Sequence, residues 1–155
     1  MPEECRAFLF GWAPGTPRVD MPPEAGHRLG RDGVRYIALQ VHFDNPQGVP
    51  GVLDNSGFRI SVTRRLRKYD SGVLTLGSQA FAIPPGQAFY TIAPNACPSK
   101  CTSRFAGPLT VTNSGFHMHM TGRAAVTRLF RDGRELQPIG FRRHFDFECA
   151  CCCCC

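Results

Sequence analysis

No stretch of this 155-residue chain is apolar enough, over the length required, to form a membrane-spanning helix. Its first residues lack the basic start and the apolar core of an export signal. A convincing helical period of apolar residues is missing as well. Because charged residues are only 19% against 43% hydrophobic residues, a disordered polar chain is excluded. These absences leave a chain of strands and turns, long enough for one domain.

The basic residues do not form a nucleic-acid-binding pattern. The net charge of +6 comes largely from arginine, and the densest cluster is Arg64, Arg65, Arg67 and Lys68. This cluster has no interleaved aromatic residues and matches none of the usual RNA- or DNA-binding motifs. We interpret it as a solvated basic surface and expect no nucleic-acid partner.

The distribution of apolar residues predicts an all-β fold. The 16 glycines and 13 prolines are spread along the chain, as is typical of short strands joined by many turns. Arg131-Asp132-Gly133-Arg134 has the turn residues of a hairpin. Apolar or alternating segments that we expect to be strands are 7–12, 36–43, 58–63, 72–76, 79–83, 89–93, 108–112, 116–120, 124–130, 135–139 and 141–147. Their spacing favours an antiparallel β-sandwich.

Two histidines stand out in the segment 116–120. His117 and His119 are two residues apart, so on a strand both side chains point to one face. Phe116, Met118 and Met120 then occupy the opposite, apolar face. Many His-x-His pairs are only surface or hydrogen-bonded core residues. The apolar alternation instead favours a strand that presents two imidazoles to one metal ion.

The remaining three histidines differ in their surroundings. His42 lies in the alternating segment 36–43, opposite the apolar face, and is a further candidate metal ligand. We expect His27, in an irregular stretch, to be exposed to solvent. His144, in an aromatic segment, is predicted to be a partly buried structural residue.

The cysteines are distributed unevenly. Of nine, six are in the tail at Cys149 and Cys151 to Cys155, and the others are Cys5, Cys97 and Cys101. Cys97-x3-Cys101 could begin a zinc site, but no second Cys/His pair has suitable spacing. The low-complexity tail 149–155 could capture soft metal ions, although a misread or prematurely ended coding sequence is the favoured interpretation.

Several segments together resemble the copper type II, ascorbate-dependent monooxygenases, in particular the dopamine β-hydroxylase and monooxygenase X branch. The resemblance runs from Cys5 to about Phe147, and its strongest pieces are Leu39-Gln40-Val41-His42-Phe43-Asp44-Asn45-Pro46 and His117-Met118-His119-Met120-Thr121-Gly122-Arg123. Further matching pieces are 10–15, 54–59, 66–72, 82–86, 97–101 and 131–135. The number and the order of these pieces carry the resemblance.

The resemblance implies a fold of two antiparallel, jelly-roll-like β-sandwich domains, each holding one copper. Residues 1–46 would be the end of the first, electron-transfer domain, and 51–148 a partial second, oxygen-activating domain. His42 would be the third ligand of the electron-transfer copper. His117 and His119 would be both histidines of the oxygen-activating copper. The other three of the six ligands, a His-His pair and a methionine, would lie outside this chain.

The resemblance also implies ascorbate as the electron donor, a small-molecule substrate and O2. Cys5 would pair with an upstream cysteine, and Cys97 and Cys101 with downstream ones. Thr75 stands where dopamine-type relatives carry an acidic residue; it could be a substrate-binding position or simply a strand residue. A secreted or secretory-vesicle location is expected for a full-length protein, so we interpret the chain as a fragment, inactive alone. The alternative is a non-catalytic copper-binding or structural β-sandwich module.

Overall fold

The computed structural model describes residues 7–14, 16, 18–78 and 80–146. The chain divides into two units. Unit 1 comprises Met1–Leu9 and Met21–Val73, and unit 2 comprises Phe10–Asp20 and Leu74–Cys155. The predicted domain boundary between residues 46 and 51 stays a prediction.

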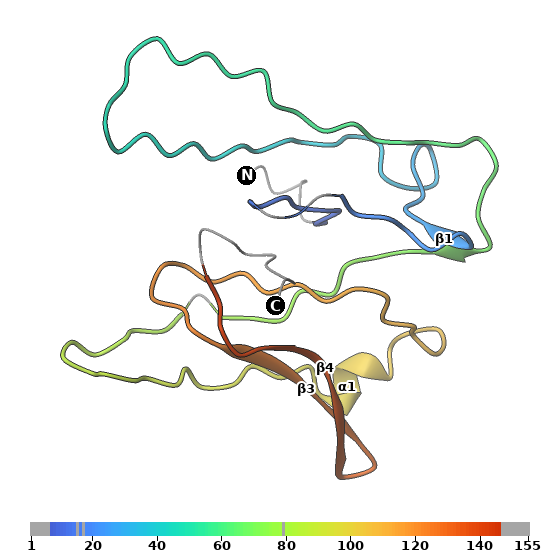
Figure 1. Ribbon diagram of the computed structural model, residues 1–155. Helices are drawn as coiled ribbons and strands as arrows, with labels where there is room; N and C mark the ends of the chain where they lie inside the picture. Colours follow the sequence, from blue (N-terminus) through green and yellow to red (C-terminus); the bar gives the residue numbers. More distant parts are fainter. Residues whose placement is uncertain (1–6, 15, 17, 79, 147–155) are drawn as a thin grey trace. The chain divides into compact units, whose positions relative to one another are not determined.

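All but one of the regular elements are strands (Figure 1). Unit 1 contains β1 (Ala25–Gly26) and β2 (Tyr69–Asp70), which pair in parallel. Unit 2 contains the four-residue helix α1 (Ser99–Thr102) and the antiparallel strands β3 (Ala125–Arg131) and β4 (Arg134–Arg142). The fold class is therefore all-β, as the sequence predicts, whereas the sandwich arrangement stays a prediction. No helix of the described residues is long and apolar enough to cross a membrane.

The β3–β4 hairpin is confirmed where the sequence places it. Asp132 and Gly133 both have positive φ, 52° and 73°, which is the backbone of a two-residue hairpin turn that matches the twist of its strands. The register joins Arg131 to Arg134 at the turn and Ala125 to Arg142 at the open end. One irregularity between Thr127 and Leu129 interrupts the ladder.

The paired strands of unit 1 are held by backbone hydrogen bonds and by an arginine. The backbone N–H groups of Tyr69 and Ser71 donate to Glu24 and Gly26, so the pairing extends just beyond the strands. Arg67 Nη1 donates to the carbonyl oxygens of Pro22 and Ala25, both at 2.6 Å. These contacts join segments that are more than 40 residues apart in the sequence.

The turns that glycine and proline predict are present in unit 1. Gly33 N donates to Gly30 O in the turn before residue 34. Gly48 N donates to Asn45 O, and the Asn45 side chain exchanges two hydrogen bonds of 3.0 Å with the backbone of Val49. The side-chain amide therefore closes the loop as a backbone amide would.

Most of the other segments predicted to be strands do not form strands, so these predictions are wrong. Segments 7–12, 36–43, 58–63, 72–76, 80–83, 89–93, 108–112, 116–120 and 143–146 carry no strand assignment in the described part of the chain. A strand exists only through ladder hydrogen bonds to a neighbour, and these segments have no such neighbour among the described residues. Apolar alternation alone therefore does not produce a sheet here.

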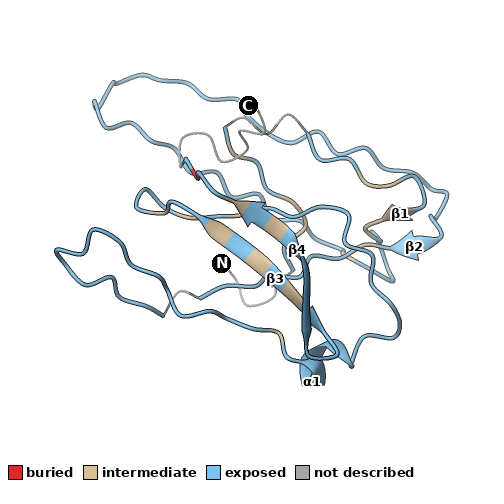
Figure 2. Ribbon diagram, turned by 60° about the horizontal axis from the view of Figure 1, so that its bottom comes forward, coloured by how far each residue is buried: buried red, intermediate tan, exposed pale blue. Residues whose placement is uncertain are grey.

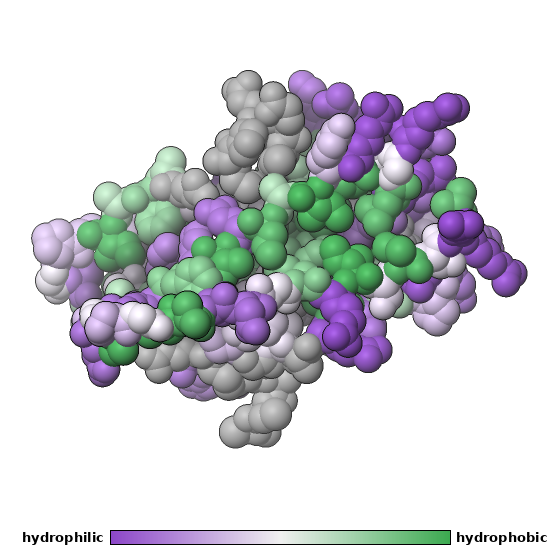
Figure 3. All heavy atoms as spheres, turned by 90° about the horizontal axis from the view of Figure 1, so that it is seen from above, coloured by the Kyte–Doolittle hydropathy of each residue, from purple (hydrophilic) through white to green (hydrophobic). Residues whose placement is uncertain are grey.

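The chain leaves an unusually large area open to solvent. Its accessible surface is 14736 Å², about twice the ~7,700 Å² that the size scaling gives for a compact 17.1 kDa protein. Phe145, 6% exposed, is the buried hydrophobic residue of the described part (Figure 2). Large apolar side chains lie open on the face drawn in Figure 3. The described residues therefore do not enclose a hydrophobic core.

Candidate metal centre

His117 and His119 lie side by side in unit 2. Their ring centroids are 5.3 Å apart and the ring planes meet at 81°, an edge-to-face arrangement. Both side chains are exposed, whereas Phe116 and Met118 are half-buried. The alternation predicted from the sequence is therefore present at these four positions, although the segment forms no strand ladder.

The histidine segment approaches the hairpin on its N-terminal side and ends in a turn on its C-terminal side. A Cβ at Gly140 of β4 would collide with the side chain of Ser114 and approach the ring of Phe116 to 3.1 Å. After the histidines, Gly122 N donates to His119 O at 2.8 Å and closes a turn. The lack of a side chain at position 140 thus lets residues 114–116 pack on β4.

The paired imidazoles fit copper as two of its ligands. Imidazole nitrogen suits copper in both oxidation states. The described residues contain no cluster of three or more His, Cys, Asp or Glu side chains that could hold an ion. Met118 shares the half-buried face with Phe116, away from the exposed histidines. These two histidines would therefore form part of a site, to which other donors must be added.

His42 is in unit 1, where one side chain contacts its ring. The amide nitrogen of Gln40 lies 2.9 Å from His42 Nε2. Since an amide nitrogen only donates, His42 Nε2 is the acceptor in this contact. Gln40 therefore fixes the orientation of the imidazole, and Nε2 can bind a metal only after this hydrogen bond breaks. Sequence reasoning missed Gln40, although its i to i+2 spacing from His42 was a visible signal.

The other predicted site residues are separate from these histidines in the sequence. Thr75 is exposed, in a run of unit 2 without regular structure. Cys97 is half-buried, Cys101 is exposed, and both are free thiols. Cys5 and the tail 149–155 lie outside the described residues. The predicted disulfides and the role of Thr75 stay predictions.

Two predictions about histidine burial are wrong. His144 is exposed, whereas the next residue, Phe145, is buried and its backbone N–H donates to Arg123 O at 2.8 Å. His27 is half-buried, and its Nε2 is shielded from solvent with no hydrogen-bond partner in the described residues. It faces a cavity of about 580 Å³ in unit 1.

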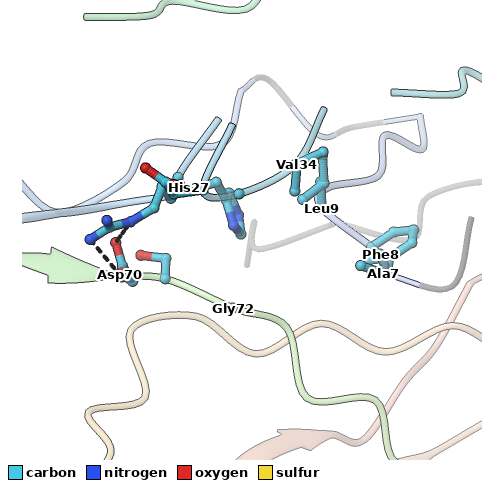
Figure 4. A pocket seen from close by; sticks show the side chains of 11 residues that line it. Ala7, Phe8, Leu9, His27, Val34, Asp70 and Gly72 are labelled. Carbon is cyan, nitrogen blue, oxygen red and sulfur yellow. Dashed lines mark hydrogen bonds and ion pairs between the residues drawn. The ribbon is translucent and has the colours of Figure 1, made fainter. Parts of the chain in front are cut away.

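The surroundings of His27 explain its burial. Figure 4 shows its ring between Asp70 and the apolar side chains of Leu9 and Val34. Arg28 forms an ion pair with Asp70, with Nη2 and Oδ2 3.1 Å apart. The ion pair and the β1–β2 pairing draw residues 27 and 70 together, a long-range effect that the sequence around His27 does not reveal.

Two family models match the sequence. The N-terminal domain of the copper type II ascorbate-dependent monooxygenases matches residues 1–50, and their C-terminal domain matches residues 69–151, which is more than half of the chain. This chain belongs to the copper type II ascorbate-dependent monooxygenase family. Copper and ascorbate are therefore the cofactors of its family. The predicted histidines fall within the two matched regions.

Curated proteins are similar to this chain over nearly its whole length. The chain is 37% identical over 147 residues to dopamine beta-hydroxylase of Homo sapiens, covering 91% of this chain and 24% of the relative. It is 34% identical over 148 residues to tyramine beta-hydroxylase of Caenorhabditis briggsae, covering 92% and 25%. A DBH-like monooxygenase protein 1 of Gallus gallus is 34% identical over 152 residues, covering 92% and 25%.

The chain thus spans about a quarter of the length of the curated relatives it matches. No solved structure matches it.

Proposed function

We propose that this chain is part of a copper- and ascorbate-dependent monooxygenase that hydroxylates a C–H bond of a small molecule with O2. In this proposal His117 and His119 bind the oxygen-activating copper, and His42 binds the electron-transfer copper. The observation that carries it is the 5.3 Å separation of the His117 and His119 rings, both exposed on one side of their segment. Bound copper would supply the one-electron chemistry that O2 and ascorbate require.

The residues of this chain have distinct tasks in the proposal. His117 and His119 would hold the ion through their ring nitrogens. Phe116 and Met118, on the half-buried face, anchor the segment. Gln40 would have to release His42 Nε2 before that nitrogen could bind the electron-transfer copper. The domain assignment belongs to the proposal too: residues 1–46 in the electron-transfer domain, 51–148 in the oxygen-activating domain, and 149–155 as a separate tail.

The 155-residue chain by itself is proposed to be inactive, because it contains three of the six ligand positions of the family. The open surface of 14736 Å² supports this, since ligands on a segment without a core are not held in place. A full-length protein would act in a secretory vesicle or outside the cell. The substrate is proposed to be a small molecule, with Thr75, an exposed residue of unit 2, either as a contact to it or without a part in binding.

The competing function is a copper-binding or structural module without catalysis. The exposed imidazole pair also favours metal binding without turnover, because the described residues add no third donor to it. The two functions differ in a longer chain that carries the missing ligands. A monooxygenase consumes O2 with ascorbate and hydroxylates a substrate, and it loses this activity in His117→Ala. A binding module takes up copper with no such turnover.

Copper titration of the present chain tests the assignment directly. With the cysteines alkylated, so that no thiol binds or reduces the copper, we expect one weak cupric site, with affinity lowered at least about tenfold in His117→Ala and in His119→Ala, because each removes one of two donors. His144→Ala is the matched control, since His144 is another exposed histidine of unit 2. Electron paramagnetic resonance of the cupric form reports the number of coordinated nitrogens. An unchanged titration in both single variants would refute the proposal.

A further inference from the structure

The sequence contains three pairs of adjacent basic residues, namely Arg64-Arg65, Arg67-Lys68 and Arg142-Arg143. Such pairs are recognised by serine endoproteases whose substrate pockets carry carboxylates, because each carboxylate binds one cationic side chain. An endoprotease binds its substrate as an extended segment, so it cleaves a pair only where the chain can leave its own structure. The structure therefore decides which of these pairs is accessible.

The pair Arg67-Lys68 is held by the contacts of unit 1. Arg67 Nη1 donates to the carbonyl oxygens of Pro22 and Ala25, both at 2.6 Å. The residue after the pair, Tyr69, begins β2, and Lys68 Nζ lies over its ring, 4.9 Å from the centroid. An enzyme that binds this pair has to break these contacts together with the pairing of β1 and β2.

The pair Arg142-Arg143 is held at the end of the hairpin. Arg142 is the last residue of β4 and pairs with Ala125 of β3. The guanidinium carbon of Arg143 lies 5.3 Å from the centroid of the Phe141 ring. An enzyme reaches this pair only after the end of the hairpin ladder has opened, which costs free energy.

The pair Arg64-Arg65 has no such restraint. Residues 59–66 form neither a strand nor a helix (Figure 1), and all of them are exposed. No ion pair of the described residues involves Arg64 or Arg65. The backbone N–H of Arg65 donates to Thr63 Oγ1 at 3.1 Å, a contact within the segment itself. The segment can therefore extend into an enzyme without disturbing β1 and β2.

We propose that the Arg65–Leu66 bond is a processing site for a serine endoprotease specific for paired basic residues. Arg64 and Arg65 supply the two cationic side chains before the bond, and Leu66 after it is 67% exposed. The bond lies outside the regions 1–50 and 69–151 that the two family domains match. Cleavage there leaves both matched regions intact.

The cleavage consumes one water molecule. The serine hydroxyl of the enzyme attacks the carbonyl carbon of Arg65, forms an acyl ester and releases Leu66 as a new amino terminus. Water then hydrolyses the ester, so that Arg65 ends in a carboxylate and the serine hydroxyl is restored. After this reaction His42 is on one polypeptide, and His117 and His119 are on the other.

Limited digestion of the full chain with an endoprotease specific for paired basic residues tests the order of cleavage. We expect cleavage after Arg65 to be at least about tenfold faster than after Lys68 or Arg143, because only the latter two require structure to open. Mass spectrometry of the fragments identifies each cleaved bond. Short synthetic peptides that contain one pair each give the rates without a fold. If the full chain is cleaved with the same relative rates as the peptides, the proposal fails.

Single substitutions separate the roles of the two arginines. Arg65→Gln should abolish this cleavage. Arg64→Gln should slow the enzyme specific for pairs severalfold, yet leave the rate of trypsin after Arg65 unchanged, because trypsin requires one basic residue. Arg59→Gln is the matched control, an exposed arginine of the same segment that belongs to no pair. An equal loss of rate in Arg59→Gln and Arg64→Gln would overturn recognition of the pair.

The protection of the second pair is tested at Gly26. A Cβ at this position would lie 3.4 Å from Arg67 Cδ, so the branched side chain of Gly26→Val should push Arg67 away from the carbonyl groups that it contacts. Cleavage after Lys68 should then rise severalfold, while cleavage after Arg65 keeps its rate. Gly57→Val is the control, because a Cβ there meets no atom within 4 Å.

An unchanged rate after Lys68 in Gly26→Val would contradict the protective role of the Arg67 contacts. None of these measurements involves copper, so their outcome is separate from that of the proposed function.

Discussion

The β3–β4 hairpin and the segment 36–43 have similar patterns of apolar residues, but only the hairpin forms strands. Both contain alternating apolar residues, many of them β-branched or aromatic. The hairpin completes its ladder within 18 residues, from Ala125 to Arg142. Segment 36–43 forms no ladder, and Tyr36 and Phe43 are 89% and 69% exposed. Of these two apolar patterns, the one that forms long strands is the one whose partner is close along the chain, and the paired strands that join distant segments, β1 and β2, are only two residues long.

The largest effect expected from this difference is the loss of cooperative unfolding in the isolated chain. A folded domain of this length absorbs about 110 kcal/mol at its thermal midpoint, at roughly 0.7 kcal/mol per residue. With exposed apolar segments and open strand edges, we expect no heat-absorption peak of that size in calorimetry, and a tendency to aggregate.

Hydrogen exchange locates the same contrast within the molecule. The amides of 125–142 should exchange more slowly than those of 36–43, because only the former donate to a ladder. The chain in 6 M guanidinium chloride provides the unprotected reference. A sharp calorimetric transition, or equal protection in both segments, would show that the open segments find partners after all.

The same contrast explains what the sequence could predict. The Asp132-Gly133 turn was predictable because the two residues that need positive φ carry that information themselves. The exposure of both His117 and His119 was predictable because residues two apart in an extended segment point to the same side. By contrast, the shielded Nε2 of His27 depends on Asp70 and Leu9, which are 43 and 18 residues away. The short helix α1 was missed because its sole local signal is Pro98 directly before it.

An intermediate effect is expected where the histidine segment contacts the hairpin. Gly140→Val should push residues 114–116 off β4, since a side chain there collides with Ser114. Valine favours strands, so any loss comes from the collision rather than from strand propensity. We expect copper affinity to fall severalfold and the nuclear Overhauser contact between the His117 and His119 rings to weaken.

Two further variants sharpen this experiment. Ser114→Gly combined with Gly140→Val should recover part of the affinity, because the colliding side chain is gone. Gly115→Val is the control, since a Cβ at position 115 meets no atom within 4 Å. Unchanged affinity in the Gly140→Val variant would mean that the pair is held independently of the hairpin.

The smallest effect is expected at the ion pair that crosses the hairpin. Arg128 donates to both carboxylate oxygens of Glu135, at 2.7 and 2.6 Å. These hydrogen bonds hold the pKa of Glu135 below its usual value. A carboxyl with a lowered pKa in the folded state stabilises that state above its ordinary pKa, and this contribution is lost as the pH falls through the lowered pKa. Acid should therefore loosen the hairpin before it affects segments without an ion pair.

A carbon-detected NMR titration of the Glu135 carboxyl measures this effect. In Arg128→Ala the pKa of Glu135 should rise toward its ordinary value. In Arg128→Lys the rise should be partial, because lysine keeps the charge but lacks the two-pronged donor geometry. Arg131→Ala is the control, since it removes an equal charge from the same hairpin without removing this pair. Added salt should reduce the difference between the parent chain and Arg128→Ala, because both partners are exposed to solvent. If Arg131→Ala raised the pKa as much as Arg128→Ala, the general charge of the hairpin rather than the cross-strand bonds would set the ionisation of Glu135.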